Sequence, residues 1–312
     1  MAERIVIALG GNAILTDDPT AQAQMKALDA TCDYIVPLIA AGDEVIITHG
    51  NGPQVGNLLL QQEAANSEKN PAMPLDTCVA MTQGSIGYWT MLAMRGALKR
   101  AGIKKLVQVL AMTATVSPDD PAFKNPTKPI GPFYSEGQAR ELMAANPNET
   151  YIEDAGRGWR RVVPSPEPME LPGCAGINAL ADAGIVVICT GGRGIPVLED
   201  DKGVYGVEGV IDKDLTAEKI AETVDADHLV ICTGVDNVCV DFGKPTQRAL
   251  STISIAEAEQ YIEEGQFPAG SMLPKVRGCM RFVQSGEGRR ATITSLECLA
   301  KLNEGAGTTI VR

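Results

Sequence analysis

Short apolar runs that end in glycine recur along the chain. Val45, Ile46 and Ile47 form a β-branched run long enough for a buried strand and too short for a helix. The run ends in Gly-Asn-Gly at 50–52, and Pro53 suits the first helical position, where a missing N–H costs nothing. A strand, a tight turn and a helix N-terminus direct backbone N–H groups to one point, where an anion is the natural ligand. A plain strand-to-helix turn, with glycines for steric reasons, explains this single motif equally well.

The same alternation continues through most of the sequence. Strand-like apolar runs lie at 4–9, 106–111, 185–189, 228–232, 291–294 and 308–311, and helical periodicity is found at 21–41, 76–100, 173–183 and 254–264. Glycine turns at 10–11 and 191–194 resemble the one at 50–52, and Asp214 is expected to cap a helix that runs to about 224. Alternating strands and helices predict an α/β fold, with a mainly parallel sheet covered on both faces and ligands at the carboxyl ends of its strands.

The segment 117–168 interrupts this alternation. It holds nine of the 19 prolines, and its clusters KNPTKP at 124–129 and RGWRR at 157–161 carry five positive charges. A long excursion of this kind predicts an inserted subdomain or lid that stands off the main sheet. The alternative is a structural insertion whose basic side chains are simply solvated. We expect an N-terminal lobe at 1–183, which includes this subdomain, and a C-terminal lobe at 184–312.

Composition narrows the function. A net charge of −12 over 312 residues argues against a nucleic-acid or anionic-membrane partner. The eight cysteines contain no CxxC pair, which is typical of a reduced, cytoplasmic protein without disulfides or a zinc site. The only histidines are His49 and His228, so histidine-based metal or triad chemistry is unlikely to be the mechanism. The uncharged stretch 77–94 is too polar at its centre to span a membrane, and we interpret it as a helix in a core or a subunit interface.

The glycine turns and isolated lysines favour a site for a ligand rich in anionic oxygens. Phosphoryl transfer requires neutralisation of those oxygens, Mg²⁺ and in-line positioning of donor and acceptor. No GxxxxGK[ST] sequence occurs, and GNGPQVG at 50–56 is one residue too long for GxGxxG. P-loop enzymes and typical dinucleotide dehydrogenases are therefore disfavoured.

Eight segments, in order and spanning nearly the whole chain, make the sequence resemble carbamate kinase of the amino acid kinase family. They are ALGGNA (8–13), THGNGPQVGN (48–57), MTQGSIGYW (81–89), NPTKPIGPF (125–133), DAGRGWRRVVPSP (154–166), VIDKDL (210–215), TGVDNVCVDFGKP (233–245) and EGQFPAGSMLPKV (264–276). Other amino acid kinases carry a lysine two residues before the first glycine pair, where this chain has Ala8. In carbamate kinase, Lys128 on the subdomain takes the compensating role.

The resemblance implies a three-layer αβα sandwich, a homodimer, and reversible phosphoryl transfer between ATP and carbamate with Mg²⁺. In fermentative cells the reverse direction makes ATP at the end of arginine breakdown. The N-terminal lobe would bind carbamate or carbamoyl phosphate, and the C-terminal lobe the nucleotide. The resemblance also implies a role for each site residue. Carbamate and the transferring phosphoryl would be held by Gly10, Gly11, Asn12, Asn51 and Gly52, and positive charge on the phosphates would come from Lys128, Lys213 and Lys275. Asp214 would orient the lysines or reach the metal through water, and the nucleotide would be bound by Thr233, Gly234, Val235, Met272 and Pro274.

Simpler interpretations stand beside these roles. Lys213 between two aspartates also fits a surface ion pair, Lys275 a solvated lysine in a first helical turn, and Lys128 a stiffener of the insertion. Arg193 stands where the family has glycine, so it adds charge beside the phosphates, crowds the carbamate pocket or faces outward. Cys239 follows the nucleotide turn, so its modification would block ATP unless it is a buried strand cysteine.

Two other functions remain open on sequence alone. One is a related kinase of the same fold that acts on an acyl carboxylate such as N-acetylglutamate, against which Ala8 and the insertion argue. The other is a non-catalytic nucleotide-binding sensor or scaffold subunit, which only Arg193 favours.

Overall fold

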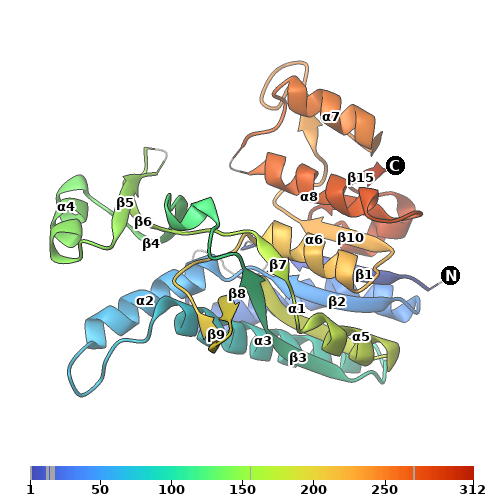
Figure 1. Ribbon diagram of the computed structural model, residues 1–312. Helices are drawn as coiled ribbons and strands as arrows, with labels where there is room; N and C mark the ends of the chain where they lie inside the picture. Colours follow the sequence, from blue (N-terminus) through green and yellow to red (C-terminus); the bar gives the residue numbers. More distant parts are fainter. Residues whose placement is uncertain (1, 12–13, 15–17, 155, 270) are drawn as a thin grey trace.

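The structure is a computed structural model that describes residues 2–11, 14, 18–154, 156–269 and 271–312; the side chains at 190–193 are outside the description. Its main sheet has ten strands in the order β13-β15-β14-β10-β1-β2-β8-β3-β7, with β9 paired to β8 (Figure 1). The bounds are β1 Arg4–Leu9, β2 Glu44–His49, β3 Val107–Val116, β7 Pro168–Glu170, β8 Val186–Asp200, β9 Gly203–Gly206, β10 His228–Cys232, β13 Thr252–Ser254, β14 Arg290–Thr294 and β15 Thr308–Val311. The strands β14, β10, β1, β2, β8 and β3 run parallel, and the antiparallel pairs lie towards the edges.

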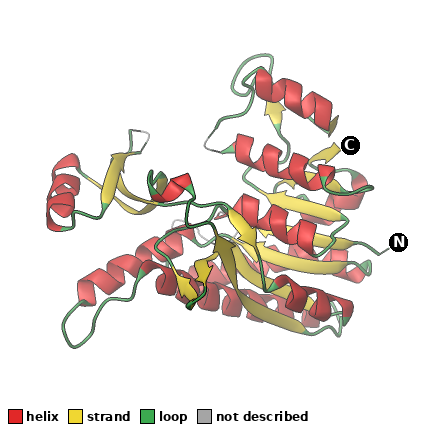
Figure 2. Ribbon diagram, in the orientation of Figure 1, coloured by secondary structure: helices red, strands yellow, loops and turns green. Residues whose placement is uncertain are grey.

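Helices cover both faces of this sheet (Figure 2). One core packs α5 (Cys174–Asp182), α6 (Lys213–Thr223), α7 (Ile255–Glu263) and α8 (Met272–Gln284) against it. A second core, on the other face, contains α1 (Ala21–Ala40), α3 (Leu75–Arg100) and the 3₁₀ helix η3 (Leu299–Glu304). The predicted three-layer αβα sandwich is confirmed. The main sheet contains strands from both sides of the expected lobe boundary at 183/184. The division into two lobes stays a prediction.

The excursion after β3 forms a small subdomain that stands off the main sheet (Figure 1). The 3₁₀ turn η2 (Pro121–Phe123) leads into β4 (Lys128–Tyr134), α4 (Glu136–Ala145), β5 (Thr150–Glu153) and β6 (Trp159–Val163). The strands form an antiparallel sheet in the order β4-β6-β5. Its base packs on α2 (Gly52–Ala65), on α3 and on the segment before α6 through one apolar cluster: Val55, Leu75, Val79, Ile130, Val163 and Val210. The pair β11 (Cys239–Val240) and β12 (Arg248–Ala249) completes the strands.

Two local expectations are corrected. The glycines at 191–194 do not form a turn at a strand end, because β8 continues through them to Asp200. It continues because β3 also continues, and the pairing resumes at Thr113 and Ile195 after a register shift. The cap of α6 is Asp212, whose side chain accepts from the N–H of Asp214, rather than Asp214 itself.

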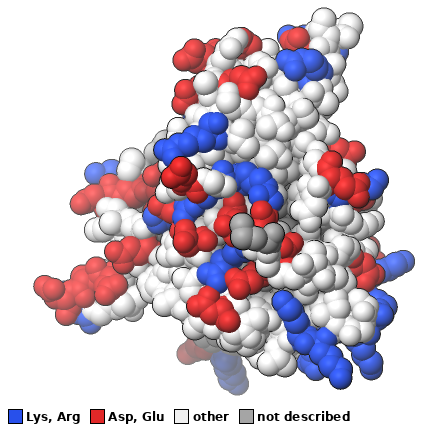
Figure 3. Space-filling view, turned by 90° about the vertical axis from the view of Figure 1, so that its right-hand side faces the viewer, with Lys and Arg blue, Asp and Glu red and all other residues white. Residues whose placement is uncertain are grey.

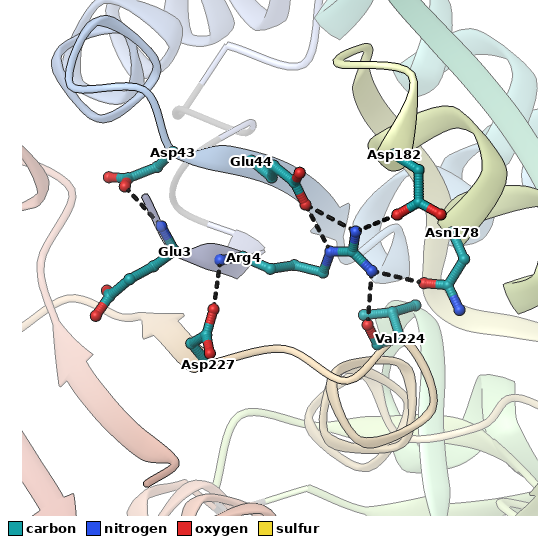
Figure 4. A network of polar contacts seen from close by, with 8 residues as sticks. All are labelled: Glu3, Arg4, Asp43, Glu44, Asn178, Asp182, Val224 and Asp227. Atoms are coloured by element: carbon teal, nitrogen blue, oxygen red, sulfur yellow. Dashed lines mark hydrogen bonds and ion pairs between the residues drawn. The ribbon is translucent and has the colours of Figure 1, made fainter. Parts of the chain in front are cut away.

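A polar network ties together the amino ends of the central strands (Figure 4). The Arg4 guanidinium donates to Glu44 at 2.8 Å, Asp182 at 2.6 Å, Asn178 at 3.1 Å and the Val224 carbonyl at 3.0 Å. These partners come from β2, α5 and the end of α6. The network closes the edge of the sheet opposite to the carboxyl ends of its parallel strands.

Acidic and basic side chains are interspersed over the face shown in Figure 3, so no field of a single sign covers it. Among the described residues, no helix is both long and apolar enough to cross a membrane.

Candidate active site

The carboxyl ends of the parallel strands converge on one cavity. β1 leads to Gly10 and Gly11, and its neighbour β10 leads to Thr233 and Gly234. The cavity has a volume of about 180 Å³ and is lined by Gly10, Gly11, Lys213, Cys232, Thr233, Gly234, Lys275 and Leu296. Six of the lining residues are predicted site residues, and they come from opposite halves of the sequence: Gly10, Gly11, Lys213, Thr233, Gly234 and Lys275.

Two of the glycine turns leave room for Lys213. A Cβ at Gly50 would lie 3.3 Å from the Lys213 Cδ, and one at Gly10 would lie 3.9 Å from its Nζ. The same Cβ at Gly10 would lie 2.9 Å from the Cys232 carbonyl oxygen of β10, closer than real Cβ atoms approach. A side chain at Gly10 would therefore force the ends of β1 and β10 apart, while its contact with Lys213 would be an ordinary van der Waals contact.

A buried carboxylate holds two of the three predicted lysines. The Asp214 side chain is 5% exposed; its Oδ2 accepts from Lys275 Nζ at 2.8 Å, and its Oδ1 lies 3.2 Å from Lys213 Nζ. Burial of a charge is costly unless it is paired, and the two lysines supply that pairing from α6 and α8. The interpretation of Lys213 as a surface ion pair is therefore wrong, because its side chain is only 20% exposed and its partner carboxylate is buried.

The third lysine reaches the same region from the subdomain. Lys128 begins β4, and its Nζ lies 2.7 Å from Asp212 Oδ2, with both side chains 25% exposed. The three lysines thus lie on three elements, β4, α6 and α8. Each of them pairs with Asp212 or Asp214 at the start of α6. Sequence reasoning named the lysines and Asp214 but missed Asp212.

Asn51 lies at the end of β2 with its amide orientation fixed. Its Nδ2 donates to Thr82 Oγ1 at 2.9 Å, because the Thr82 hydroxyl donates to the Val79 carbonyl at 2.7 Å and has only lone pairs left to offer. Helix α2 begins at Gly52, one residue before the predicted start at Pro53. Asn12 lies outside the described residues.

The histidines carry no charge at neutral pH. Burial lowers the pKa of His49 to about 4 and that of His228 to about 3. His228 Nε2 hydrogen-bonds Thr292 Oγ1 at 2.8 Å inside the core. Neither imidazole supplies a cation to the site, which agrees with a mechanism that uses none.

On the predicted nucleotide side, Thr233 and Gly234 line the cavity, while Val235, Met272 and Pro274 are not among its lining residues. Met272 is the first residue of α8 and packs against the core, and Pro274 lies in the same first turn as Lys275. Their contact with a nucleotide stays a prediction. The side chain of Arg193 is outside the description.

The arginines of the second basic cluster have partners within the subdomain and, for Arg161, on the segment before α6. Arg157 and Arg160 lie over the Phe133 ring at 4.9 and 5.1 Å, and both pair with Asp154. Arg161 pairs with Glu149 at 3.0 Å and with Glu208 at 3.2 Å. They are neither simply solvated nor in contact with the described cavity.

Comparison with known proteins decides the family. The model of the amino acid kinase family matches residues 3–295. Carbamate kinase 1 of Enterococcus faecium is 54% identical, with all of both chains covered, and the carbamate kinase of Lentilactobacillus hilgardii is 53% identical, covering 100% of this chain and 98% of its own. The chain belongs to the carbamate kinases of the amino acid kinase family.

A solved carbamate kinase shares the whole architecture. The enzyme from Giardia lamblia, bound to AMP-PNP, has a TM-score of 0.92 and 42% identity, covering 99% of this chain and 98% of its own. Ala8, two residues before the first glycine pair, is buried in β1, 2% exposed, between β2 and β10.

Proposed function

We propose that the chain catalyses reversible phosphoryl transfer between ATP and carbamate, with ADP and carbamoyl phosphate as products. The observation that carries the proposal is the pair Lys213 and Lys275 on the buried Asp214, beside the Gly10 turn. Relatives about half identical over the full length support the choice of carbamate as acceptor.

The chemistry follows from charge and position. Gly10, Gly11 and Asn12 from one turn, with Asn51 and Gly52 from the next, hold carbamate and the transferring phosphoryl through backbone N–H groups. The three lysines spread positive charge over the phosphate oxygens, and this charge is worth most where water is excluded. Carbamate already bears a negative oxygen, so attack requires no general base.

The nucleotide base lies against residues 233–235 on one side, with Met272 and Pro274 on the other. The nucleotide phosphates would bind together with Mg²⁺, which would neutralise the charge that develops during transfer. Among the described residues no three His, Cys, Asp or Glu side chains group as a metal site, so phosphate oxygens supply most of its ligands. Asp214, which pairs with Lys213 and Lys275, would orient the two lysines or reach the metal through water.

A homodimer is part of the proposal. Three large apolar side chains on α3 are exposed, Met81 at 46%, Tyr88 at 53% and Leu92 at 41%, and their spacing of seven and four residues places them on one helix face. A second copy of the chain would cover that face. Tyr88→Glu should shift the mass measured by light scattering from dimer to monomer, and a wild-type monomer would contradict the proposal.

We place the enzyme in the cytoplasm, where free thiols persist, because all eight cysteines are free and six of them are buried. We also propose that its physiological direction is towards ATP formation in arginine catabolism.

The decisive experiment measures ATP formation from ADP, Mg²⁺ and carbamoyl phosphate, with acetyl phosphate as the control donor. Rapid ATP formation from carbamoyl phosphate alone is expected. Bound nucleotide without turnover would favour the sensor or scaffold function, and phosphorylation of N-acetylglutamate from ATP would favour the acyl-carboxylate kinase.

A further inference from the structure

The segment before α6 contacts the subdomain at every second residue. Glu208 pairs with Arg161 at 3.2 Å, and Asp212 pairs with Lys128 at 2.7 Å. These two ion pairs join the subdomain to the same short segment of the main body. Only the second involves a lysine that the proposed function uses.

An apolar contact lies between the two ion pairs. Val210 belongs to the cluster at the base of the subdomain, together with Ile130 of β4. Ile130 is two residues from Lys128 on the strand, and Val210 is two residues from Asp212 along the segment, so one apolar contact sets the register for the ion pair. A backbone hydrogen bond of 2.9 Å from the Val210 N–H to the Pro164 carbonyl fixes the same alignment.

The Asp212 carboxylate is itself held in place. Its Oδ1 accepts from the N–H of Asp214 at 2.9 Å as the cap of α6, and its Oδ2 accepts from Lys128. One oxygen is therefore fixed on the helix that carries Lys213 and Asp214, and the other fixes the lysine that comes from the subdomain. The carboxylate joins the two parts of the site.

The pair leaves Lys128 able to act. An ammonium has three N–H donors, and the bond to Asp212 uses one, so two remain for phosphate oxygens. The side chain is a flexible four-carbon chain, and holding its end beforehand removes conformational entropy that transfer would otherwise cost. At 25% exposure the ammonium stays within reach of a ligand.

We propose that Asp212 is a positioning residue for phosphoryl transfer: it holds Lys128, and with it the subdomain, over the site. This inference rests on the proposed function. It predicts that losing the carboxylate slows the transfer step without weakening the binding of substrates, because a negative charge is removed beside an anionic ligand.

The test is Asp212→Asn, since asparagine caps a helix as well as aspartate but carries no charge. We expect kcat for ATP formation from carbamoyl phosphate to fall about tenfold, and KM not to rise. In a Lys128→Ala background the same substitution should change kcat less than about twofold, because the group that it positions is gone. An unchanged kcat in Asp212→Asn, or an equal loss in both backgrounds, would overturn the proposal.

Glu208→Gln is the matched control, because it removes the other ion pair between the same segment and the subdomain. Its kcat should stay close to that of the wild type; a loss as large as that of Asp212→Asn would show that general docking matters and not Lys128. If Asp212→Asn folds poorly by circular dichroism, Asp212→Ser replaces it, because serine also caps.

A second readout does not depend on turnover. Labelling with an amine-reactive ester, followed by peptide mass spectrometry, should modify Lys128 faster in Asp212→Asn than in the wild type, and at the wild-type rate in Glu208→Gln. Equal rates in all three proteins would refute positioning even if the enzyme were inactive. A wild type that makes no ATP, with Lys128 labelled faster in Asp212→Asn, would count against the proposed function alone.

Discussion

Gly56 and Gly131 bring helix α2 and the subdomain into direct backbone contact. A Cβ at Gly56 would lie 2.8 Å from the Gly131 Cα and 3.0 Å from its nitrogen, and Gly131 has a φ of +71°. The helix that starts at the Gly52 turn thus supports the strand that carries Lys128. The distance between the two glycines sets how closely the subdomain approaches the site.

Gly56→Ala should therefore displace the subdomain. Backbone atoms of β4 cannot move aside as a flexible side chain can, so we expect kcat to fall about tenfold or more, with ADP affinity changed little. Alanine favours the helix by up to about 1 kcal/mol over glycine, so α2 itself should remain folded. Steady-state kinetics and ADP titration measure the two effects.

Gly137→Ala provides the control for this substitution. Gly137 lies in α4 of the subdomain, and no atom lies within 4 Å of the Cβ that alanine would add. Its kcat should match the wild type. A Gly56→Ala enzyme with normal kcat would show that the subdomain tolerates the displacement.

Lys128→Ala should lower kcat far more than it weakens ADP binding. The lysine is held by Asp212 at the subdomain edge and, in our proposal, neutralises charge that develops during transfer. We expect a loss of about a hundredfold in kcat, a size that single electrostatic donors reach. Equal losses in kcat and in ADP affinity, measured by calorimetry, would make Lys128 a general anion site instead.

The local pattern of hydrophobic residues was sufficient to predict the elements that are buried because their own sequence is apolar. The apolar runs at 5–7, 45–47 and 229–231 became β1, β2 and β10, and glycine and proline at 52–53 begin α2. The site lysines were named because the segments that contain them, NPTKPIGPF, VIDKDL and EGQFPAGSMLPKV, are among the eight segments that resemble one family.

What the sequence did not predict depends on distant partners. By residue type, Asp212 and Asp214 are equally plausible N-caps of α6. In the fold Asp212 is the cap, and its carboxylate also pairs with Lys128, which lies 84 residues away in the sequence. The strand β8 passes through its glycines only because β3 continues beside it. The arginines at 157–161 gave a basic cluster in sequence, but Asp154, Glu149 and Glu208 neutralise them in the fold.

Arg4→Met should destabilise the fold and leave catalysis unchanged. The Arg4 side chain is 17% exposed and serves acceptors on β2, α5 and α6, which would lose their donor. We expect a loss of about 2–4 kcal/mol in the free energy of unfolding from urea titration. Arg100→Met is the control: its pair with Asp33 is more than half exposed on both sides, so the loss of stability should be far smaller. An Arg4→Met enzyme of wild-type stability would show that the network is dispensable.

Modification of the Cys239 thiol should block nucleotide binding. It is one of two cysteines that are not fully buried, with Cys298, and its Sγ lies 3.8 Å from Gln247 Nε2. A thiol reagent should label Cys239, ADP should slow that labelling, and activity should fall with it. The Cys239→Ser enzyme should keep its activity in the reagent. Stoichiometric labelling of Cys239 with full activity would refute the link.

Glu218 should make stability fall as the pH rises towards neutrality. It is 8% exposed on α6, and burial, with Glu222 and Glu167 nearby, raises its pKa to about 7 despite Arg281 and Lys219. Between about pH 4.5 and pH 7 the folded protein therefore binds a proton that the unfolded chain has lost. This favours the folded state at low pH, and the advantage disappears as the pH rises through 7.

Glu218→Gln removes this penalty, because its neutral amide never has to ionise in a buried position. At pH 8 the variant should be more stable than the wild type by on the order of 2 kcal/mol in urea titration, and at pH 5 the difference should be much smaller. Glu263→Gln, at an exposed position on α7, makes the same charge change and should show little dependence on pH. A Glu218→Gln effect of equal size at both pH values would mean that packing, and not ionisation, accounts for it.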